Sequence, residues 1–111
     1  MDAPSFSVLI LTLNEEANLP ACLDSVRWCD DVVLLDSGSS DRTVAIARDR
    51  GVRVYERPFD DFASQRNYAV TRIPFQHPWI FHLDADERFT PELRAECDEA
   101  AARDDRSGYL V

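Results

Sequence analysis

Asp84 and Asp86 carry the clearest chemical signal in the sequence, because they follow the apolar segment 79–83 and are separated by one residue. Side chains two residues apart in an extended segment project to the same side, so both carboxylates are expected near one point. Two like charges this close raise each other's pKa unless a cation lies between them. The pair therefore favours a divalent hard cation, completed by water and substrate phosphates. The same spacing is also typical of a solvated turn or a helix cap.

The segment 36–43, Asp-Ser-Gly-Ser-Ser-Asp-Arg-Thr, follows a second apolar run and allows two interpretations. Gly38 and the serines can simply turn the chain into a helix that Asp41 caps. Alternatively, Asp36 can accept hydrogen bonds from a ribose or a base edge, and its small neighbours let a planar ring approach the backbone. Arg66 is a candidate contact for a diphosphate or a base, because guanidinium groups bind phosphate oxygens in a bidentate manner. A solvated or salt-bridged arginine is the structural alternative.

Several other residues favour a structural role. His82 lies two residues before Asp84, where a buried neutral histidine is favoured over a catalytic base, and His77 lies between two loop prolines. We expect Glu87 and the other acidic clusters to cap helices or to be solvated. The aromatic residues fit core packing. The cysteines lack Cys-x-x-Cys spacing and are expected to be reduced, structural thiols of a cytosolic protein: Cys22, Cys29 and Cys97.

Length and composition exclude several classes of protein. The chain has 111 residues, 45% of them hydrophobic and 30% charged, which is typical of one packed soluble domain over 1–111. A formal net charge of -9 makes nucleic acid and acidic membrane surfaces unexpected partners. The longest apolar run, 6–13, is too short to cross a bilayer and lacks the basic flank of a signal peptide.

Apolar and amphipathic segments alternate along the chain. Strands are predicted at 6–13, 31–36, 52–56 and 79–84, with the start of a fifth at 108–111. Helices are predicted from residue 19 with Asn18 as N-cap, from 43 to Gly51, through 63–73, and from 90 to about 103. Right-handed crossovers then give an α/β three-layer sandwich with a mainly parallel sheet. Such sheets bind ligands beyond the carboxyl ends of their strands, where the strand order reverses.

Three segments together resemble the nucleotide-sugar-binding half of a family-2 glycosyltransferase of the GT-A fold. Segment 7–26 corresponds to that family's first apolar strand and its Thr-Tyr-Asn-Glu-type continuation. Segment 32–43 corresponds to its Asp-Asp-Gly-Ser-x-Asp-x-Thr run, and 79–93 to its metal-binding Asp-x-Asp unit. The amino-acid sequences of segments 62–70 and 84–93 are most similar to the bacterial branch that includes glucosyl- and heptosyltransferases of lipopolysaccharide core assembly.

The resemblance implies a role for each matching position. The nucleotide-sugar site would consist of Leu11, Leu13, Glu15, Asp36, Ser37, Arg66, Asp84 and Ala85. Asp86 would be the direct ligand of Mg²⁺ or Mn²⁺, with Asp84 beside it. This chain departs from the family pattern at two base-recognition positions. Leu13 replaces an aromatic residue that commonly stacks on uracil, and Ser37 replaces the second aspartate.

The implied reaction is inverting glycosyl transfer from a nucleotide-diphosphate sugar, with a UDP-sugar favoured, to a hydroxyl of a glycan or glycolipid acceptor. In that family the catalytic base and acceptor site come from the second half of the domain. The resemblance therefore implies that residues 1–111 are a truncated N-terminal portion, inactive alone and without a catalytic residue of their own. We expect a cytoplasmic location, or the inner face of the inner membrane for a longer chain, and a homodimer through the open sheet edge.

Two other functions stay open at this stage. A haloacid-dehalogenase-type phosphatase also places Asp-x-Asp after an apolar strand and uses the first aspartate as nucleophile. The late position of the motif disfavours it, as does Arg88, which stands where that family has Thr or Val. The second alternative is a non-catalytic nucleotide-binding or assembly fragment.

Overall fold

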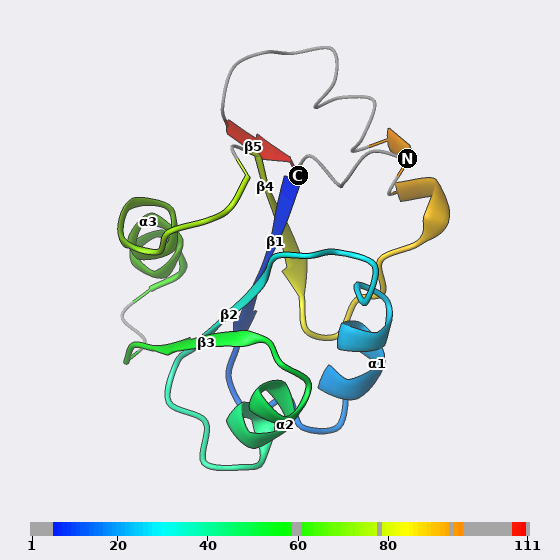
Figure 1. The fold of residues 1–111 in the computed structure, drawn as a ribbon. Coiled ribbons are helices and arrows are strands. Elements are labelled where there is room, and N and C mark those ends of the chain that lie inside the picture. Colours follow the sequence, from blue (N-terminus) through cyan, green and yellow to red (C-terminus); the bar gives the residue numbers. More distant parts are fainter. Residues whose placement is uncertain (1–5, 59–60, 78, 94, 97–107, 111) are drawn as a thin grey trace.

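The computed structural model describes residues 6–58, 61–77, 79–93, 95–96 and 108–110. These residues form a five-stranded sheet with helices on both sides (Figure 1). In chain order the elements are β1 (Phe6–Thr12), α1 (Leu19–Asp24), β2 (Val32–Asp36), α2 (Thr43–Asp49), β3 (Arg53–Glu56), α3 (Phe62–Arg72), β4 (Trp79–Asp84) and β5 (Gly108–Leu110). The predicted strands are confirmed to within one residue at each end. The helix predicted from residue 90 is helical at 91–93 and 95–96, and its remainder falls outside the described residues.

The strand pairs are parallel, and the strand order is β3-β2-β1-β4-β5. The chain therefore builds outward from β1 through β2 and β3, and then returns to the other side of β1 for β4. The order reverses between β1 and β4, and ligands of open parallel sheets bind beyond the carboxyl ends of strands at such a point. The predicted α/β fold with a parallel sheet is confirmed.

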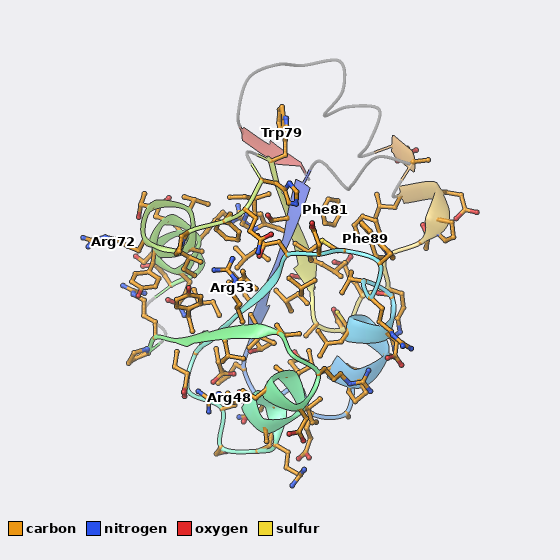
Figure 2. All side chains as sticks on the ribbon, viewed as in Figure 1. Arg48, Arg53, Arg72, Trp79, Phe81 and Phe89 are labelled. Carbon is orange, nitrogen blue, oxygen red and sulfur yellow. The ribbon has the colours of Figure 1, made fainter. Side chains whose placement is uncertain are left out.

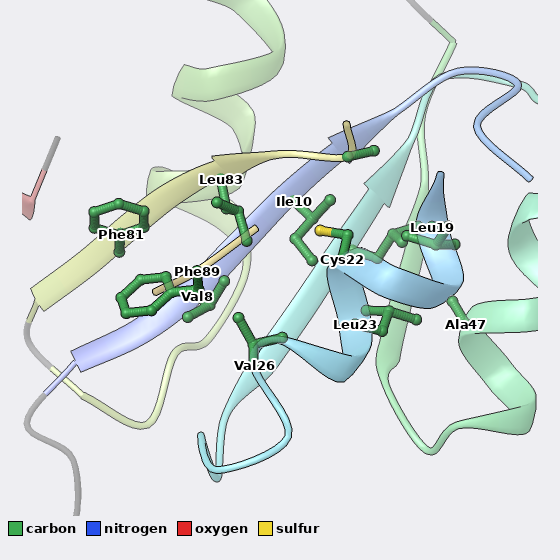
Figure 3. Close-up of a cluster of buried hydrophobic side chains, with 12 residues drawn as sticks. Val8, Ile10, Leu19, Cys22, Leu23, Val26, Ala47, Phe81, Leu83 and Phe89 are labelled. Atoms are coloured by element: carbon green, nitrogen blue, oxygen red, sulfur yellow. The ribbon is translucent and has the colours of Figure 1, made fainter. Parts of the chain in front are cut away.

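The alternation of side chains along β1 divides the core into two halves. Val8 and Ile10 face α1 and α2 in the cluster drawn in Figure 3, where Leu23 packs against them. Leu9 faces the opposite side of the sheet and packs with Ala69 of α3. All three β1 side chains are fully buried, as a central strand covered on both faces requires. The predicted three layers follow directly from this packing.

An aromatic contact connects β4 to the segment that follows it. The rings of Phe81 and Phe89 lie next to each other beside β4 (Figure 2), with centroids 4.8 Å apart in an edge-on arrangement. Trp28 packs on Phe89, with their ring centroids 5.0 Å apart. The predicted core role of Phe81 is thus confirmed, and Phe89 joins the chain that follows β4 to the same core.

Local signals explain two of the helix starts. The carboxylate of Asp61 accepts a 2.7 Å hydrogen bond from the backbone N–H of Ser64, so it caps α3 as predicted. Pro74 follows α3 closely and cannot continue it. Asn18 is the N-cap residue of α1 as predicted, but its side chain makes no capping bond. Its amide donates to the carboxylate of Glu15 at 3.3 Å instead.

Candidate functional site

The predicted metal ligands lie where β4 leaves the sheet, beside the end of β1. Asp84 is the last residue of β4, and Asp86 lies in the turn that follows. Both residues are exposed, whereas Ala85 between them is only 2% exposed and packs in the core. The two carboxylates are therefore held outward by the burial of the residue that separates them.

The electrostatic surroundings of Asp84 are dominated by negative charge. Partial desolvation raises the pKa of this carboxyl above its usual value, and the charges of Glu87, Asp86 and Glu15 raise it further. The guanidinium of Arg66 acts in the opposite direction. Loops after β1 and β4 and the helix α3 thus contribute charges to one region. Such a group of carboxylates favours a bound cation.

The donor set fits a cation site that a substrate completes. Within the described residues, no three His, Cys, Asp or Glu side chains are grouped closely enough to hold a metal ion by themselves. Mg²⁺ commonly uses only one or two protein carboxylates and takes its other oxygen ligands from water and phosphates. Asp84 and Asp86 match that chemistry in number and in atom type.

Glu87 closes the turn that carries the two aspartates. Its backbone N–H donates to the carbonyl of Asp84 at 2.9 Å, and its carboxylate accepts from the N–H of Asp84 at 3.0 Å. The thiol of Cys22 on α1 donates to the same carbonyl at 3.7 Å. Glu87 is exposed, as the solvated alternative predicted, and its bonds close a turn and do not cap a helix.

The two histidines have structural surroundings, as predicted. His82 is half-buried, and burial lowers its pKa to about 4, with a further contribution from the positive charge of Arg66. It is therefore neutral at pH 7. His77 lies with Nε2 2.8 Å from the carboxylate of Asp30, at the opposite edge of the sheet from Asp84.

Asp36 organises the loop after β2 through its carboxylate. One oxygen accepts from the hydroxyls of Thr12 (2.8 Å) and Ser39 (2.5 Å). The other accepts from the backbone N–H groups of Gly38 (3.0 Å) and Ser39 (2.7 Å). A carboxylate offers about four lone-pair sites, and Asp36 is fully buried. A direct bond from Asp36 to a ligand would therefore require one of these internal bonds to open.

The loops after β1 and β2 are joined by hydrogen bonds. Asn14 adopts a left-handed backbone with φ 53°, and its side-chain oxygen accepts from the N–H of Ser40 at 2.8 Å. The N–H of Glu15 donates to the hydroxyl of Thr43 at 2.8 Å. Asp41 accepts from the N–H of Thr43 at 2.9 Å, but the N-cap residue of α2 is Arg42, so the predicted N-cap position of Asp41 is wrong by one residue. The predicted residues of both loops thus belong to one connected rim.

The other predicted nucleotide contacts lie around this rim. Leu13 is 49% exposed and is the one large hydrophobic side chain so exposed among the described residues. Leu11 is half-buried against the α3 side of the core. Ser37 is half-buried at the end of β2, and Arg66 is exposed on α3. These four residues therefore lie on or directly after β1, β2 and α3, near the carboxyl ends of the strands.

Sequence reasoning missed Gln65, which contacts this rim from α3. It is 1% exposed, and its amide donates to the hydroxyl of Ser37 at 2.9 Å. The signal was its spacing of four residues from Ala69, which is itself four from Ile73. This spacing places a polar side chain on the buried face of the helix, where it needs a partner.

A pocket of about 780 Å³ lies at the amino ends of the strands, at the opposite end of the sheet from Asp84. Its lining comes from the end of α1, the starts of β2 and β3 and the segment before β4, and includes Arg27, Arg50, Asp31 and Arg53 (Figure 2 labels Arg53). None of the predicted site residues lines it. Its position at the amino ends of the strands separates it from the Asp84 region.

Known proteins resemble the chain in sequence and in fold. A lipopolysaccharide core biosynthesis glycosyltransferase, LpsC of Rhizobium meliloti, is 38% identical over 111 residues, covering 95% of this chain and 40% of the relative. Glucosyl-3-phosphoglycerate synthase of Mycobacterium tuberculosis, solved with Mn²⁺, UDP and glucosyl-3-phosphoglycerate, has a TM-score of 0.58 and 27% identity. That match covers 76% of this chain and 35% of the synthase chain. Staphylococcus aureus TarS shares the fold, with a TM-score of 0.70 and 22% identity over 88% of this chain and 32% of its own.

The chain spans less than half the length of these relatives. Within the described residues, none of the helices has the length and apolar character needed to cross a bilayer. Segments 7–26, 32–43 and 79–93 comprise most or all of β1, β2 and β4 together with the chain that follows each strand. The family description "Glycosyl transferase family 2" matches residues 7–111. The agreement of motif, strand order and family match makes this chain a member of glycosyl transferase family 2.

Proposed function

We propose that the protein transfers a sugar from a nucleotide-diphosphate sugar to an acceptor hydroxyl with inversion, and that residues 1–111 supply the donor and metal site. The observation that carries this proposal is the position of Asp84 and Asp86, outward-facing at the end of β4 where the strand order reverses. UDP and Mn²⁺ in the similar synthase structure support a UDP-sugar and a divalent ion. The name of LpsC supports a lipopolysaccharide or other cell-envelope glycan as acceptor. The proposal places the reaction in the cytoplasm.

The chain's own residues have separable tasks in this proposal. Leu13 offers uncovered apolar surface to the nucleobase, and Ser37 lies on the neighbouring strand for polar contacts. Asp86 and Asp84 would hold Mg²⁺ or Mn²⁺, which supplies Lewis-acid stabilisation of the diphosphate leaving group. Arg66 adds a positive charge near Asp84. The proposal places the base that removes the acceptor proton beyond residues 1–111.

The spacing of the strands is consistent with one nucleotide reaching both the end of β2 and the end of β4. The end of β2 is separated from the end of β4 by β1 alone. Two strand spacings amount to about 10 Å. A nucleoside lying over the ends of β1 and β2 therefore directs its diphosphate toward Asp84 and Asp86.

Calorimetry with UDP, GDP and their sugars, with and without Mn²⁺, tests the proposal. We expect nucleotide binding that requires Mn²⁺ and is lost in Asp86→Ala. Asp49→Ala, an exposed aspartate on α2 away from the site, is the matched control and should bind as the unaltered protein does. Binding that is unaffected by Asp86→Ala would contradict the assignment of the metal site. Metal-independent phosphate release from a small ester, blocked by Asp84→Asn, would favour a phosphatase instead.

A further inference from the structure

A buried amide lies directly behind Ser37 at the carboxyl end of β2. The Nε2 group of Gln65 donates to the Oγ of Ser37 at 2.9 Å and to the backbone carbonyl of Arg57 at 3.0 Å. The guanidinium of Arg57 donates to the Oε1 of Gln65 at 2.6 Å. Both amide hydrogens and the amide oxygen therefore have partners. These partners fix the orientation of the amide, because a flipped amide would direct its N–H₂ at a guanidinium donor.

Arg57 is itself held in place from two sides. Its backbone N–H donates to the carbonyl of Asp36 at 2.9 Å, which continues the pairing of β2 with β3. Its guanidinium lies over the ring of Tyr68 on α3, 5.3 Å from the ring centroid. Gln65 is thus clamped between the end of the sheet and its own helix. A fully partnered buried network of this kind is rigid and sensitive to the loss of one member.

The fixed orientation of the Gln65 amide leaves the hydroxyl of Ser37 available as a hydrogen-bond donor. Because Gln65 supplies the proton of their shared bond, the hydroxyl proton of Ser37 must be donated to another acceptor. Among the described residues, the bond from Gln65 is the side-chain bond that this hydroxyl makes, and it makes none as a donor. The adjacent carboxylate of Asp36 already accepts four bonds, three from its own loop and one from Thr12 of β1. Ser37 is half-buried at the carboxyl rim, so its proton is available to a ligand.

We propose that Gln65 is a positioning residue for nucleotide recognition, which holds Ser37 as a hydrogen-bond donor toward an acceptor atom of the nucleobase. The inference rests on the proposed function and deepens it. A carboxylate at position 37 could only accept a hydrogen bond, whereas this serine donates one. The chain therefore selects a base that presents a carbonyl oxygen or an unprotonated ring nitrogen at this point. Gln65 acts through Ser37 and does not itself touch the nucleotide.

Gln65→Glu tests this inference because it keeps the shape of the side chain, reverses the bond to Ser37 and removes the bond to the carbonyl of Arg57. The carboxylate retains the Arg57 contact, which favours its ionised form, but it can only accept from Ser37. Ser37 would then donate to Glu and present lone pairs to the ligand. With Mn²⁺ present, we expect the preferred nucleotide among UDP, CDP, GDP and ADP to bind about tenfold more weakly. The ranking of the four should change, while Mn²⁺-dependent binding of inorganic pyrophosphate should not.

Ser37→Ala provides the second arm of the test. Ser37 is half-buried, so this variant should fold, which thermal unfolding checks for every variant. It should alter the ranking of nucleotides and remove any further effect of Gln65→Glu in the double variant. An unchanged ranking in Ser37→Ala would overturn the inference. So would a Gln65→Glu effect that persists in the double variant or weakens pyrophosphate equally.

Failure of this inference can be told apart from failure of the proposed function. If the unaltered protein binds none of the four nucleotides with Mn²⁺, the donor site itself is overturned, and the role of Gln65 with it. If the unaltered protein binds a nucleotide but the two variants leave the ranking intact, only the role of Gln65 is overturned.

Discussion

Leu11 on β1 and Asp84 on β4 are partners in the parallel register of the sheet. The two strands therefore leave the sheet at nearly the same level, as their adjacent lower ends in Figure 1 show. Leu13 follows two residues after Leu11, and Asp86 two residues after Asp84. An uncovered apolar side chain and an outward carboxylate are thus positioned by one pair of neighbouring strands.

The turn that carries Asp84 should depend on Glu87 through a neutral acceptor and not through charge. Glu87→Ala removes the acceptor for the N–H of Asp84, so we expect Mn²⁺-dependent nucleotide binding to weaken about threefold to tenfold. Glu87→Gln retains an oxygen for that N–H and loses only the negative charge near Asp84, so it should weaken binding less than Glu87→Ala does. Calorimetry measures both. Equal losses in the two variants would show that the charge of Glu87 matters instead.

Asn14 should be sensitive to substitution because it combines a left-handed backbone with a bond to Ser40. Asn14→Ala loses the 2.8 Å bond and puts at φ 53° a residue that adopts the left-handed region less readily than asparagine, so we expect a loss of about 2 kcal/mol in unfolding free energy. Asn14→Asp retains an acceptor and tolerates this backbone region, and should lose well under half as much. Urea unfolding followed by circular dichroism compares the two variants. An equally stable Asn14→Ala would contradict the role assigned to this contact.

Asp31 should contribute to stability in a pH-dependent way. Burial alone would raise its pKa, but bonds from the N–H of Gln76, the hydroxyl of Ser7 and the guanidinium of Arg53 outweigh this, and the net pKa is lowered. A lowered folded-state pKa gives stability that is present above the ordinary value of 3.8 and is lost as the pH falls below it. Asp31→Asn should therefore cost about 1–3 kcal/mol at pH 7.

The control for Asp31 is the pH series itself. The difference in Tm between Asp31→Asn and the unaltered protein should shrink as the pH falls through the lowered pKa, because protonation removes the same charge. Ser7→Ala should show a smaller loss in the same direction, since it removes one of the bonds. A constant difference in Tm down to the acid transition would contradict this assignment.

Cys22 and Cys29 should be poorly reactive while the protein is folded. Both are free thiols, and burial raises the pKa of each from 9.0 to about 11. The thiolate fraction at pH 8 then falls about a hundredfold relative to an ordinary thiol. In a Cys97→Ala background, a disulfide-exchange reagent should react at least that much more slowly with folded than with urea-unfolded protein. Comparable rates in the two states would contradict the burial of these thiols.

The same raised pKa values predict a loss of stability in alkali. Folded thiols hold their protons more tightly than unfolded ones, so this contribution is complete below pH 9 and is lost as the pH rises toward 11. Thermal unfolding at pH 8 and pH 10.5 measures the effect. Cys29→Ala should reduce the drop in Tm between the two conditions, whereas an unchanged drop would place its origin elsewhere.

The elements that position the site could be predicted from the sequence because their signals are local. The apolar runs of β1 and β4 are long enough to be buried strands, and Asp61 and Pro74 bracket α3. Asn18 shows where local rules fail, since a nearby Glu15 carboxylate takes its amide. The same limit applies to the clamp around Gln65. It depends on where α3 lies against the end of β2, which the chain specifies only after it has folded.

The placement of Asp84, Asp86 and the rim residues at one edge could be predicted from the parallel topology alone. The saturation of Asp36 could not, because three of its four bonds depend on a loop conformation with no fixed sequence signature and the fourth comes from Thr12 on β1. The reciprocal bonds between Glu87 and Asp84 were available in principle from their three-residue spacing. Sequence thus locates the site, while long-range contacts decide which atoms of each residue remain available.

Asp36 and Ser37 are adjacent in the chain, yet the carboxylate of Asp36 bonds within the protein and the hydroxyl of Ser37 lies at the carboxyl ends of the strands. Because the carboxylate of Asp36 maintains the loop on its own, exchange of residue 37 leaves that scaffold untouched. Under the proposed role of Ser37, nucleobase preference would be separable from the stability of the loop. Evolution or engineering can retune it with one side chain and its helix-borne neighbour, and the architecture around them is inherited intact.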